Sequence, residues 1–394
     1  MSLPLAGIRV LDVATILAGP LTASLLGEFG AEVIKVEHPE DGDPVRSYPP
    51  LVDGESAQWA VTGRNKQSVT IDLHDERGQE VFRSLVACSD VVVTNFRAPT
   101  LHRFGIDFDD LRIVKPDLVM VHLSAFGRTG PYADRPGFAR VAEAFAGLTE
   151  RTGNPDGPPM FSGYAIADGV TGIYGAFAAM LALRQRDMTG EAQLADIALY
   201  EPLLRMMEDF IVDYGATGQV ATRAGNENPK ISPNGLYRTK DEHYIVLPAS
   251  TQRMWERLVP LLEDPELEAL VTFDQRIAHR ELIDARIIEF TERHNLQELM
   301  DKLGAAGVAC GPVNDAADIC ADPHIRARGS VVEVADTDRA RPHLVQAPAG
   351  RFSGFTGHVG GNMARLGEHT EQVLTRLAGL SPQQITQLRD GGAI

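Results

Sequence analysis

The first 125 residues alternate between short apolar strands and helical segments, and this alternation limits the fold more than any other feature of the chain. Residues 7–12 predict a buried strand, residues 21–30 a helix that stops at glycine, and residues 32–37 the next strand. Strand–helix–strand units of this kind build a parallel sheet, and ligands bind past the carboxyl ends of its strands. The sequence therefore predicts an α/β fold with a doubly wound sheet.

Several classes of function are disfavoured by missing motifs. The turn after the first strand reads Ala18-Gly19-Pro20 and lacks the GxGxxG run that brings backbone close to a pyrophosphate, so a nicotinamide or flavin dehydrogenase is a poor prediction. Cys88, Cys310 and Cys320 form neither a CxxC pair nor a cysteine–histidine cluster with metal-ligand spacing. We expect no metal and no disulfide framework.

Length and charge narrow the class further. A chain of 394 residues exceeds the size at which a single core stops growing, so at least two domains are expected. A formal net charge of −17 disfavours nucleic acid or an anionic membrane surface as the main partner. No apolar run approaches the ~20 residues of a membrane span, and the first residues lack a basic signal-peptide region, which predicts a cytoplasmic protein.

The second half of the chain predicts a smaller α+β domain. Helical periodicity runs from Tyr200 to about Tyr214 and then dissolves into a polar, glycine-containing linker. A hairpin is predicted over residues 236–247 and a helix over 281–303. The tail from Val331 predicts a strand pair that includes residues 351–355, followed by a final helix near Glu371.

Residues 162–172 place one carboxylate, Asp168, between a small-residue approach and a long apolar helix. The residue type and position favour a helix N-cap, since an aspartate at a helix start usually satisfies orphan amides. The same amides would keep the carboxylate ionised and aimed, which suits an anionic reactive group. Apolar side chains at Ile173, Phe177, Met180 and Leu181 predict that the helix is buried.

Taken together, a series of segments over almost the whole chain resembles the class III CoA-transferases, a family that includes formyl-CoA and carnitine CoA-transferases and related α-methylacyl-CoA racemases. Their order and spacing carry the resemblance more than any single one. The segments are 5–12 (LAGIRVLD), 18–20 (AGP), 30–37 (GAEVIKVE), 42–46 (GDPVR), 65–68 (NKQS), 95–97 (NFR), 137–138 (GF) and 366–370 (LGEHT).

The resemblance implies a Rossmann-like large domain formed by both chain ends, a small domain, and two subunits interlocked as linked rings. On that basis we expect residues 1–214 and 331–394 to form the large CoA-binding domain, residues 215–235 the linker, and residues 236–330 the small α+β domain. The expected assembly is a homodimer.

The resemblance also implies a catalytic aspartate, and the matching residue here is Asp168. A carboxylate nucleophile suits the reaction, because CoA transfer between two carboxylic acids needs a carboxyl group that can itself carry the acyl group. The substrates implied are an acyl-CoA thioester and a small carboxylic acid, with no permanently bound cofactor. A small dicarboxylic acid such as succinate fits Arg135 and Arg140, which flank the Gly137 loop, although exposed arginines there are equally compatible with ordinary surface.

Positions that correspond to the family's CoA contacts are found in six short segments. Two of them, His38 and His74, replace basic residues of the formyl-CoA transferase pattern, so phosphate binding there would be weaker unless the imidazoles are charged. The alternative for each charged position is a solvated surface side chain. The implied CoA contacts are Ile16, Leu17, Ala18, His38, Ile71, His74, Asn95, Phe96, Arg103 and Phe104.

Four positions near the Gly137 loop and Asp168 are candidates for substrate contacts: Phe138, Arg140, Glu143 and Gly169. Gly169 could offer a backbone amide to an oxyanion, and Glu143 could orient a substrate carboxyl or be a surface residue of its helix. Related racemases use a histidine where this chain has Phe138, and a phenyl ring cannot transfer a proton, so transferase is favoured over racemase. A thioester hydrolase and a non-catalytic CoA-binding protein remain open at this point.

Overall fold

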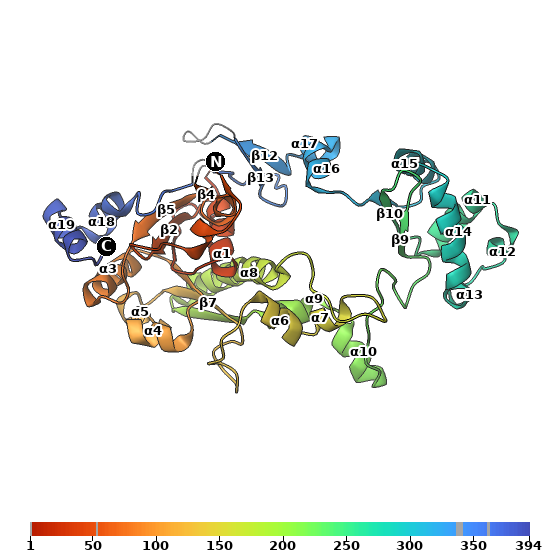
Figure 1. Cartoon of the computed structure of the whole chain (residues 1–394). Coiled ribbons are helices and arrows are strands. Elements are labelled where there is room, and N and C mark those ends of the chain that lie inside the picture. Colours follow the sequence, from red (N-terminus) through yellow and green to blue (C-terminus); the bar gives the residue numbers. More distant parts are fainter. Residues whose placement is uncertain (1, 53, 336–341, 361–362) are drawn as a thin grey trace. The chain divides into compact units, whose positions relative to one another are not determined.

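The computed structural model describes residues 2–52, 54–335, 342–360 and 363–394. The chain divides into two compact units (Figure 1). The first comprises Met1–Leu148, Ser162–Gly218 and Pro323–Ile394, and the second comprises Thr149–Phe161 and Gln219–Asp322. Residues 149–161, which we had expected in the large domain, thus group with the second unit, while 323–330 group with the first.

The first unit contains a six-stranded parallel sheet in the order β5-β2-β1-β6-β7-β8. Counted along the chain this is the doubly wound order 3-2-1-4-5-6, in which the strand order reverses between β1 and β6. The predicted α/β class with a parallel sheet is confirmed. The strands are β1 (Arg9–Asp12), β2 (Glu32–Glu37), β5 (Lys66–Thr70), β6 (Val91–Thr94), β7 (Val119–Ser124) and β8 (Gln193–Ala198).

Alternating side chains of the strands feed two separate cores, one on each face of the sheet. Val10 belongs to the core covered by α1 (Ala18–Glu28), α6 (Ala139–Phe145) and α8 (Ile166–Thr189). Its neighbour Leu11 points to the opposite core, which α3 (Glu76–Ala87) and α18 (Thr370–Ala378) cover. Both faces are therefore dry, as a parallel sheet requires.

Helix α8 is buried on one side only, so the prediction that it is wholly buried was wrong. Its glycines let α1 approach closely: a Cβ at Gly172 would lie 2.8 Å from Leu21, and one at Gly175 would lie 2.3 Å from the Thr22 hydroxyl. The opposite side exposes Phe177 by 57% together with Ile173, Met180 and Leu181. By length and composition the 24-residue helix α8 could cross a membrane, although no apolar run of that length was expected from the sequence. Core helices of soluble proteins pass the same test.

The C-terminal segment returns to the first unit. The backbone amide of His369 donates to the Ser68 carbonyl at 2.9 Å, and the Ala393 carbonyl accepts from Asp72 at 2.9 Å. The strand pair of the tail is β12 (Val331–Val334) with β13 (His343–Gln346), while residues 351–355 form no strand, contrary to prediction. Phe352 and Phe355 instead pack edge-on against Phe29.

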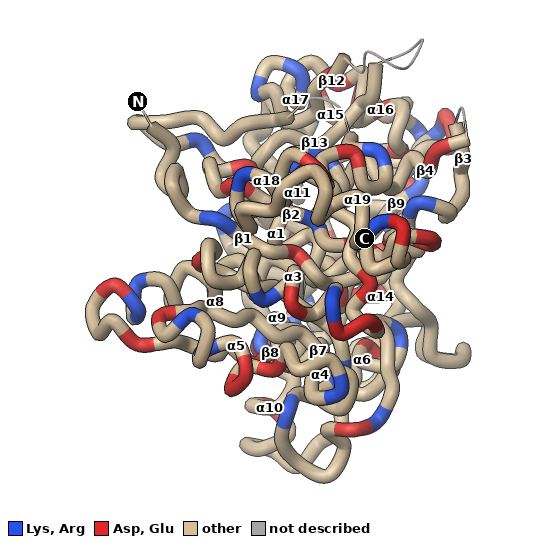
Figure 2. The backbone as a smooth tube through the Cα atoms, turned by 90° about the vertical axis from the view of Figure 1, so that its left-hand side faces the viewer, with Lys and Arg blue, Asp and Glu red and all other residues tan. Residues whose placement is uncertain are grey.

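The second unit is built on a three-stranded antiparallel sheet in the order β11 (Gly311–Pro312), β10 (Tyr244–Leu247), β9 (Gly235–Arg238), in which β9 and β10 form the predicted hairpin. The helix predicted over 281–303 is two helices, because Asn295 begins a new one with a capping box. Likewise the helix predicted from Tyr200 ends at Met206 and another starts at Phe210. Acidic and basic residues are interspersed along both units (Figure 2).

The remaining elements, in chain order, are η1 (Pro44–Ser47), β3 (Leu51–Val52), β4 (Glu55–Ser56), α2 (Trp59–Thr62), α4 (Ala98–Phe104), α5 (Phe108–Val114), α7 (Leu148–Arg151), α9 (Tyr200–Met206), α10 (Phe210–Thr217), β9 (Gly235–Arg238), β10 (Tyr244–Leu247), α11 (Gln252–Leu262), α12 (Pro265–Glu268), α13 (Phe273–Ala278), α14 (Arg280–Glu292), α15 (Leu296–Ala305), β11 (Gly311–Pro312), α16 (Ala316–Ala321), α17 (Pro323–Arg328) and α19 (Pro382–Asp390).

Candidate active site

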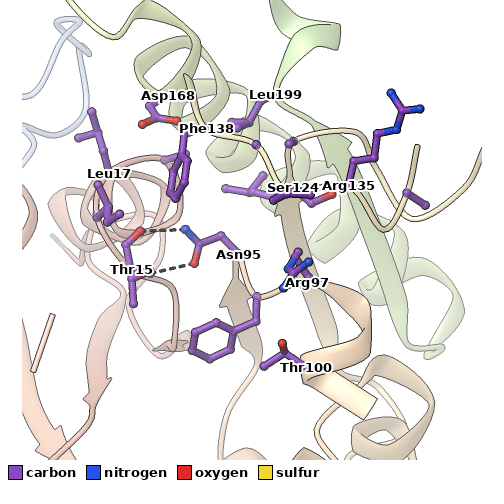
Figure 3. Close-up of a pocket in the computed structure, with 18 residues that line it drawn as sticks. Thr15, Leu17, Asn95, Arg97, Thr100, Ser124, Arg135, Phe138, Asp168 and Leu199 are labelled. Carbon is purple, nitrogen blue, oxygen red and sulfur yellow. Dashed lines mark hydrogen bonds between the residues drawn. The ribbon is translucent and has the colours of Figure 1, made fainter. Parts of the chain in front are cut away.

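A cavity of about 260 Å³ opens where the strand order reverses, between the ends of β1 and β6 (Figure 3). This is the position at which doubly wound sheets bind ligands. Asp168 and Phe138 lie at one end of the cavity in Figure 3, and Arg97 and Thr100 at the other. The lining residues are Thr15, Ile16, Leu17, Ala18, Asn95, Phe96, Arg97, Thr100, Leu123, Ser124, Ala125, Ala133, Arg135, Pro136, Gly137, Phe138, Asp168 and Leu199.

The loop after β1 is clamped from two sides. The Asn95 side chain accepts from the Thr15 amide at 2.9 Å and donates to the Thr15 carbonyl at 2.8 Å, as the dashed lines of Figure 3 show. The Asp43 carboxylate accepts from the amide of Ile16 at 3.2 Å. Ile16 has a φ of 71°, a left-handed conformation that is costly for a β-branched residue and persists only when its surroundings impose it. The cavity wall is therefore held rigidly.

A buried charge network underlies this loop. The Lys35 ammonium lies 3.0 Å from Asp43, the Lys66 ammonium lies 2.7 Å from Asp12, and all four side chains are at most 1% exposed. Burial alone would raise the pKa of Asp43, but Lys35 and the amides of Val45 and Ile16 hold that pKa below its usual value. Asp43 is thus a permanently ionised structural anchor for the loop.

Asp168 lies in the first turn of α8, but it is not the N-cap that the sequence predicted. The N-cap is Ala165, and no side chain caps the helix. Among the described residues Asp168 has no cationic partner, and burial, with a further contribution from the negative charge of Glu143, raises the pKa of Asp168 to about 6. The expected effect of the helix amides, which would lower this pKa, is outweighed by desolvation.

Glu143 is buried rather than on the helix surface, with 1% of the residue exposed. Its carboxylate accepts from the Arg140 guanidinium at 2.7 Å and from the backbone amide of Ala167, the residue before Asp168, at 3.4 Å. Arg140 therefore forms an ion pair with Glu143. The two predicted substrate contacts form a pair behind Asp168, and neither lines the cavity.

Of the other two predicted substrate contacts, Phe138 lines the cavity and Gly169, the residue after Asp168 in α8, does not. Phe138 is 70% exposed and lines the cavity beside Asp168 (Figure 3). The preceding Gly137 is required, because a Cβ there would lie 2.7 Å from the Ala125 side chain. The Gly169 amide donates to the Ala165 carbonyl at 3.4 Å, a long bond that belongs to the helix.

Most of the predicted CoA contacts meet along one edge of the sheet. The rings of His38 and His74 have centroids 6.3 Å apart, His74 and Phe104 are 4.9 Å apart, and Phe104 and Phe96 are 6.1 Å apart. The Arg103 guanidinium lies 5.2 Å from the Phe104 ring centroid. Ile71 and Phe104 are both buried, at 2% and 5% exposed, and both belong to the core on this face of the sheet.

The same edge contains a group that could hold a metal ion. One ligand atom from each of His38, Asp72 and His74 lies within 4.8 Å of the others. The sequence search missed this group because the three residues follow two different strands, β2 and β5, and no cysteine is involved. Arg135, which the sequence analysis offered together with Arg140 for a substrate carboxylate, does line the cavity, as does Arg97, whereas Arg140 does not.

A comparison with protein-family models matches residues 5–370 to CoA-transferase family III. The chain belongs to this family. A family III CoA-transferase moves CoA between an acyl-CoA thioester and a free carboxylic acid, and this is the enzyme's activity. The resemblance inferred from the sequence segments is confirmed.

Curated relatives cover nearly the whole of this CoA-transferase. The β subunit of succinyl-CoA–L-malate CoA-transferase from Chloroflexus aurantiacus is 38% identical over 394 residues, which is 98% of this chain and 97% of that subunit. Succinate–glutarate CoA-transferase from Agrobacterium fabrum is 35% identical and covers 95% of this chain and 96% of its own. Among solved structures, a CAIB/BAIF family protein from Brucella suis superposes with a TM-score of 0.85 at 33% identity, over 96% of this chain and 100% of that one.

Proposed function

We propose that the enzyme transfers CoA from succinyl-CoA to a second small carboxylic acid, and that Asp168 is the nucleophile. The observation that carries the proposal is a carboxylate without a cationic partner among the described residues, in a cavity at the switch point of a doubly wound sheet. A carboxylate that neither pairs with a cation nor caps a helix keeps its lone pairs available for attack.

The reaction proceeds through two anhydrides and one enzyme thioester. Asp168 attacks the thioester carbonyl, the carbon–sulfur bond breaks, and a mixed anhydride and CoA thiolate form. The thiolate attacks the aspartyl carbonyl, which releases succinate and leaves an aspartyl-CoA thioester. The acceptor carboxylate attacks this thioester to give a second anhydride and thiolate, and the thiolate then takes the acceptor acyl group and regenerates Asp168. No metal or bound cofactor is needed, because each step exchanges carboxylate and thiolate.

CoA lies along the edge formed by His38, His74, Phe96 and Arg103, while the ring of Phe104 is buried and packs against His74 and Phe96. Aromatic faces and an arginine suit the adenine and phosphates of CoA. The thioester end reaches the cavity through the loops of Ile16–Ala18 and Asn95, whose clamped backbone supports a fixed pose. Ile71 contributes backbone only, since its side chain is in the core.

Arg97 and Arg135 support the choice of a dicarboxylic substrate. Both line the cavity, and neither has a carboxylate partner among the described residues. Arg135 is held flat, with its guanidinium carbon 3.8 Å from the Tyr132 ring centroid. A planar guanidinium in this position binds the free carboxylate of a succinyl group. Relatives named for L-malate, D-citramalate, glutarate and mesaconate also act on short dicarboxylic acids.

The enzyme acts as an interlocked homodimer in the cytoplasm. The exposed side of α8, with Ile173, Phe177, Met180 and Leu181, is an apolar face that a soluble protein covers with a partner. A second copy of the chain supplies such a partner by symmetry. Size-exclusion chromatography with light scattering tests this: two chains per particle is expected, and a monomer at micromolar concentration would contradict it.

One experiment separates the candidate activities. Purified enzyme is incubated with succinyl-CoA and a panel of short mono- and dicarboxylic acids, and the CoA esters are identified by mass spectrometry. We expect new CoA esters of dicarboxylic acids, no exchange of the α-proton with solvent deuterium, and a hydroxamate on Asp168 after hydroxylamine trapping. Hydrolysis without exchange would favour a thioesterase, and a label on another residue would show that Asp168 is misassigned.

A further inference from the structure

We propose that Glu143, held by Arg140, is a positioning residue that sets the basicity of the Asp168 nucleophile. This inference rests on the proposed role of Asp168. Glu143 and Arg140 then act on Asp168 from within the protein, since neither lines the cavity in which the substrate binds.

The geometry fixes Glu143 close behind the nucleophile. Its carboxylate bonds the amide of Ala167, the neighbour of Asp168, so it lies against the first turn of α8. The Arg140 guanidinium, 2.7 Å away on the previous turn of α6, fixes its second oxygen and also lies 3.4 Å from the Ser162 hydroxyl. With 1% of the residue exposed, Glu143 is screened little by water.

Glu143 is the charge that acts on Asp168, because the charged groups of the other packed elements are occupied elsewhere. Its negative charge adds to burial in raising the pKa of Asp168, and Asp168 in turn contributes to the raised pKa of Tyr164. On α1, the Glu28 carboxylate pairs with Arg64 at 2.9 Å. On β7 and β8, His122 and Asp196 lie 3.5 Å apart. On α9, the Glu201 carboxylate accepts from the Ala198 amide at 3.0 Å. The acidic and basic residues of α8 itself, apart from Asp168, lie in its last turns, at Arg184, Arg186 and Asp187. Arg205 lies in the last turn of α9.

This arrangement serves the reaction in two ways. A more basic carboxylate is a stronger nucleophile, so proximity to Glu143 favours attack on the thioester. Acylation also replaces the charge of Asp168 by a neutral anhydride or thioester, which removes the repulsion with Glu143 and favours the acyl-enzyme. Arg140 holds Glu143 in place behind Asp168 and supplies the positive charge that partly offsets the negative charge of Glu143.

The proposal predicts opposite shifts for two variants. Glu143→Gln removes the repelling charge and should move the acidic limb of the kcat/KM profile to lower pH. Arg140→Gln leaves Glu143 without its cation and should move the limb to higher pH, whereas Arg140→Lys should restore it. At about pH 5, Glu143→Gln should retain several-fold more of its plateau rate than the wild type, since a tenfold change in ionisation accompanies each pKa unit.

A second measurement does not depend on turnover. Carbodiimide reacts with a protonated carboxyl group, so the pH dependence of Asp168 labelling, quantified by peptide mass spectrometry, reports its titration in the free enzyme. Labelling midpoints should shift in the same order as the rate profiles. Glu28→Gln is the matched control, because it removes another buried, arginine-bound carboxylate of the same unit and should leave the Asp168 midpoint unchanged.

The outcomes distinguish this inference from the proposed function. If the labelling midpoints shift but no CoA transfer occurs, the effect of the Glu143 charge on Asp168 is supported and the proposed function is rejected. If CoA transfer occurs but the labelling midpoints and the acidic limbs of the kcat/KM profiles stay unchanged in both variants, the effect of Glu143 on Asp168 is rejected and the proposed function stands. Shifts in the same direction for Glu143→Gln and Arg140→Gln would also overturn it, because loss of packing, rather than charge, would then explain both.

Discussion

Asp43 and Asp168 are two largely buried carboxylates, one bonded to the loop that lines the cavity and one in the cavity itself, and their surroundings have opposite effects on their pKa values. Asp43 receives an ammonium at 3.0 Å and several amides, and its pKa is lowered. Among the described residues Asp168 receives no cation, and burial together with the negative charge of Glu143 raises its pKa to about 6. The paired carboxylate builds the wall of the site, and the unpaired one is free to react. The two pKa values differ because strand β2 places Lys35 beside Asp43, whereas helix α6 places Glu143 near Asp168.

The largest expected effect comes from Asp168→Asn, which should reduce CoA transfer by about 10³-fold or more, because the amide cannot form the anhydride. The same change should stabilise the protein at neutral pH. The folded pKa of about 6 exceeds the usual 3.8, so the native state binds more protons between these values and its stability falls as pH rises through them. Above pH 6 the substitution should raise the free energy of unfolding by about 1–3 kcal/mol.

Chemical denaturation at two pH values checks this sign. The gain should be present near pH 7.5 and should vanish only below the unfolded pKa of 3.8, at roughly pH 3, where Asp168 is largely protonated in both states. A variant that is inactive but no more stable than the wild type at neutral pH would mean that Asp168 is better solvated or paired than the geometry indicates.

Asp43→Asn should have the reverse signature and the next largest effect. Its lowered pKa means that Asp43 contributes stability above the unfolded pKa, and this contribution is lost as pH falls through the folded pKa. Removing the charge takes one of its two carboxylate partners from the buried Lys35 ammonium. The free energy of unfolding should therefore fall by about 3–5 kcal/mol at neutral pH. Thermal unfolding of Asp43→Asn beside Asp168→Asn measures the contrast directly, and shifts of equal sign would break it.

Asn95→Ala tests whether the rigid wall matters for binding. It removes both bonds to Thr15 but touches no charge, so we expect a loss of about 1–2 kcal/mol in unfolding free energy. The KM for acyl-CoA should rise several-fold, and the acidic limb of the pH profile should stay in place. A shifted limb would show that the loop also influences the ionisation of Asp168.

The sequence predicted the parallel sheet because apolar strands such as β1, β6 and β7 alternate with helical segments along the chain. It singled out Asp168 because an isolated carboxylate before a long apolar segment is visible locally. It misplaced Asp168 as a cap, since Ala165 begins the helix without any capping side chain. It could not show that Glu143 is buried, because this depends on packing between α6 and α8. The Asn95–Thr15 clamp joins residues 80 positions apart and leaves no local trace. The residue-level CoA contacts stay a prediction.

The smallest expected effect concerns the exposed ring beside Asp168. Phe138 is 70% exposed, so it shields the carboxylate only in part, and Phe138→Ala should lower the pKa of Asp168 slightly by admitting water. Water at this position also competes with the acceptor acid for the acyl-enzyme, so the ratio of hydrolysis to transfer should rise about two- to fivefold. Phe138→Leu is the matched control, because it keeps an apolar side chain over Asp168 and should retain a ratio near that of the wild type. Free CoA and CoA esters measured in one chromatogram give both rates, and equal ratios in the two variants would mean that dryness at Asp168 is provided by something other than this ring.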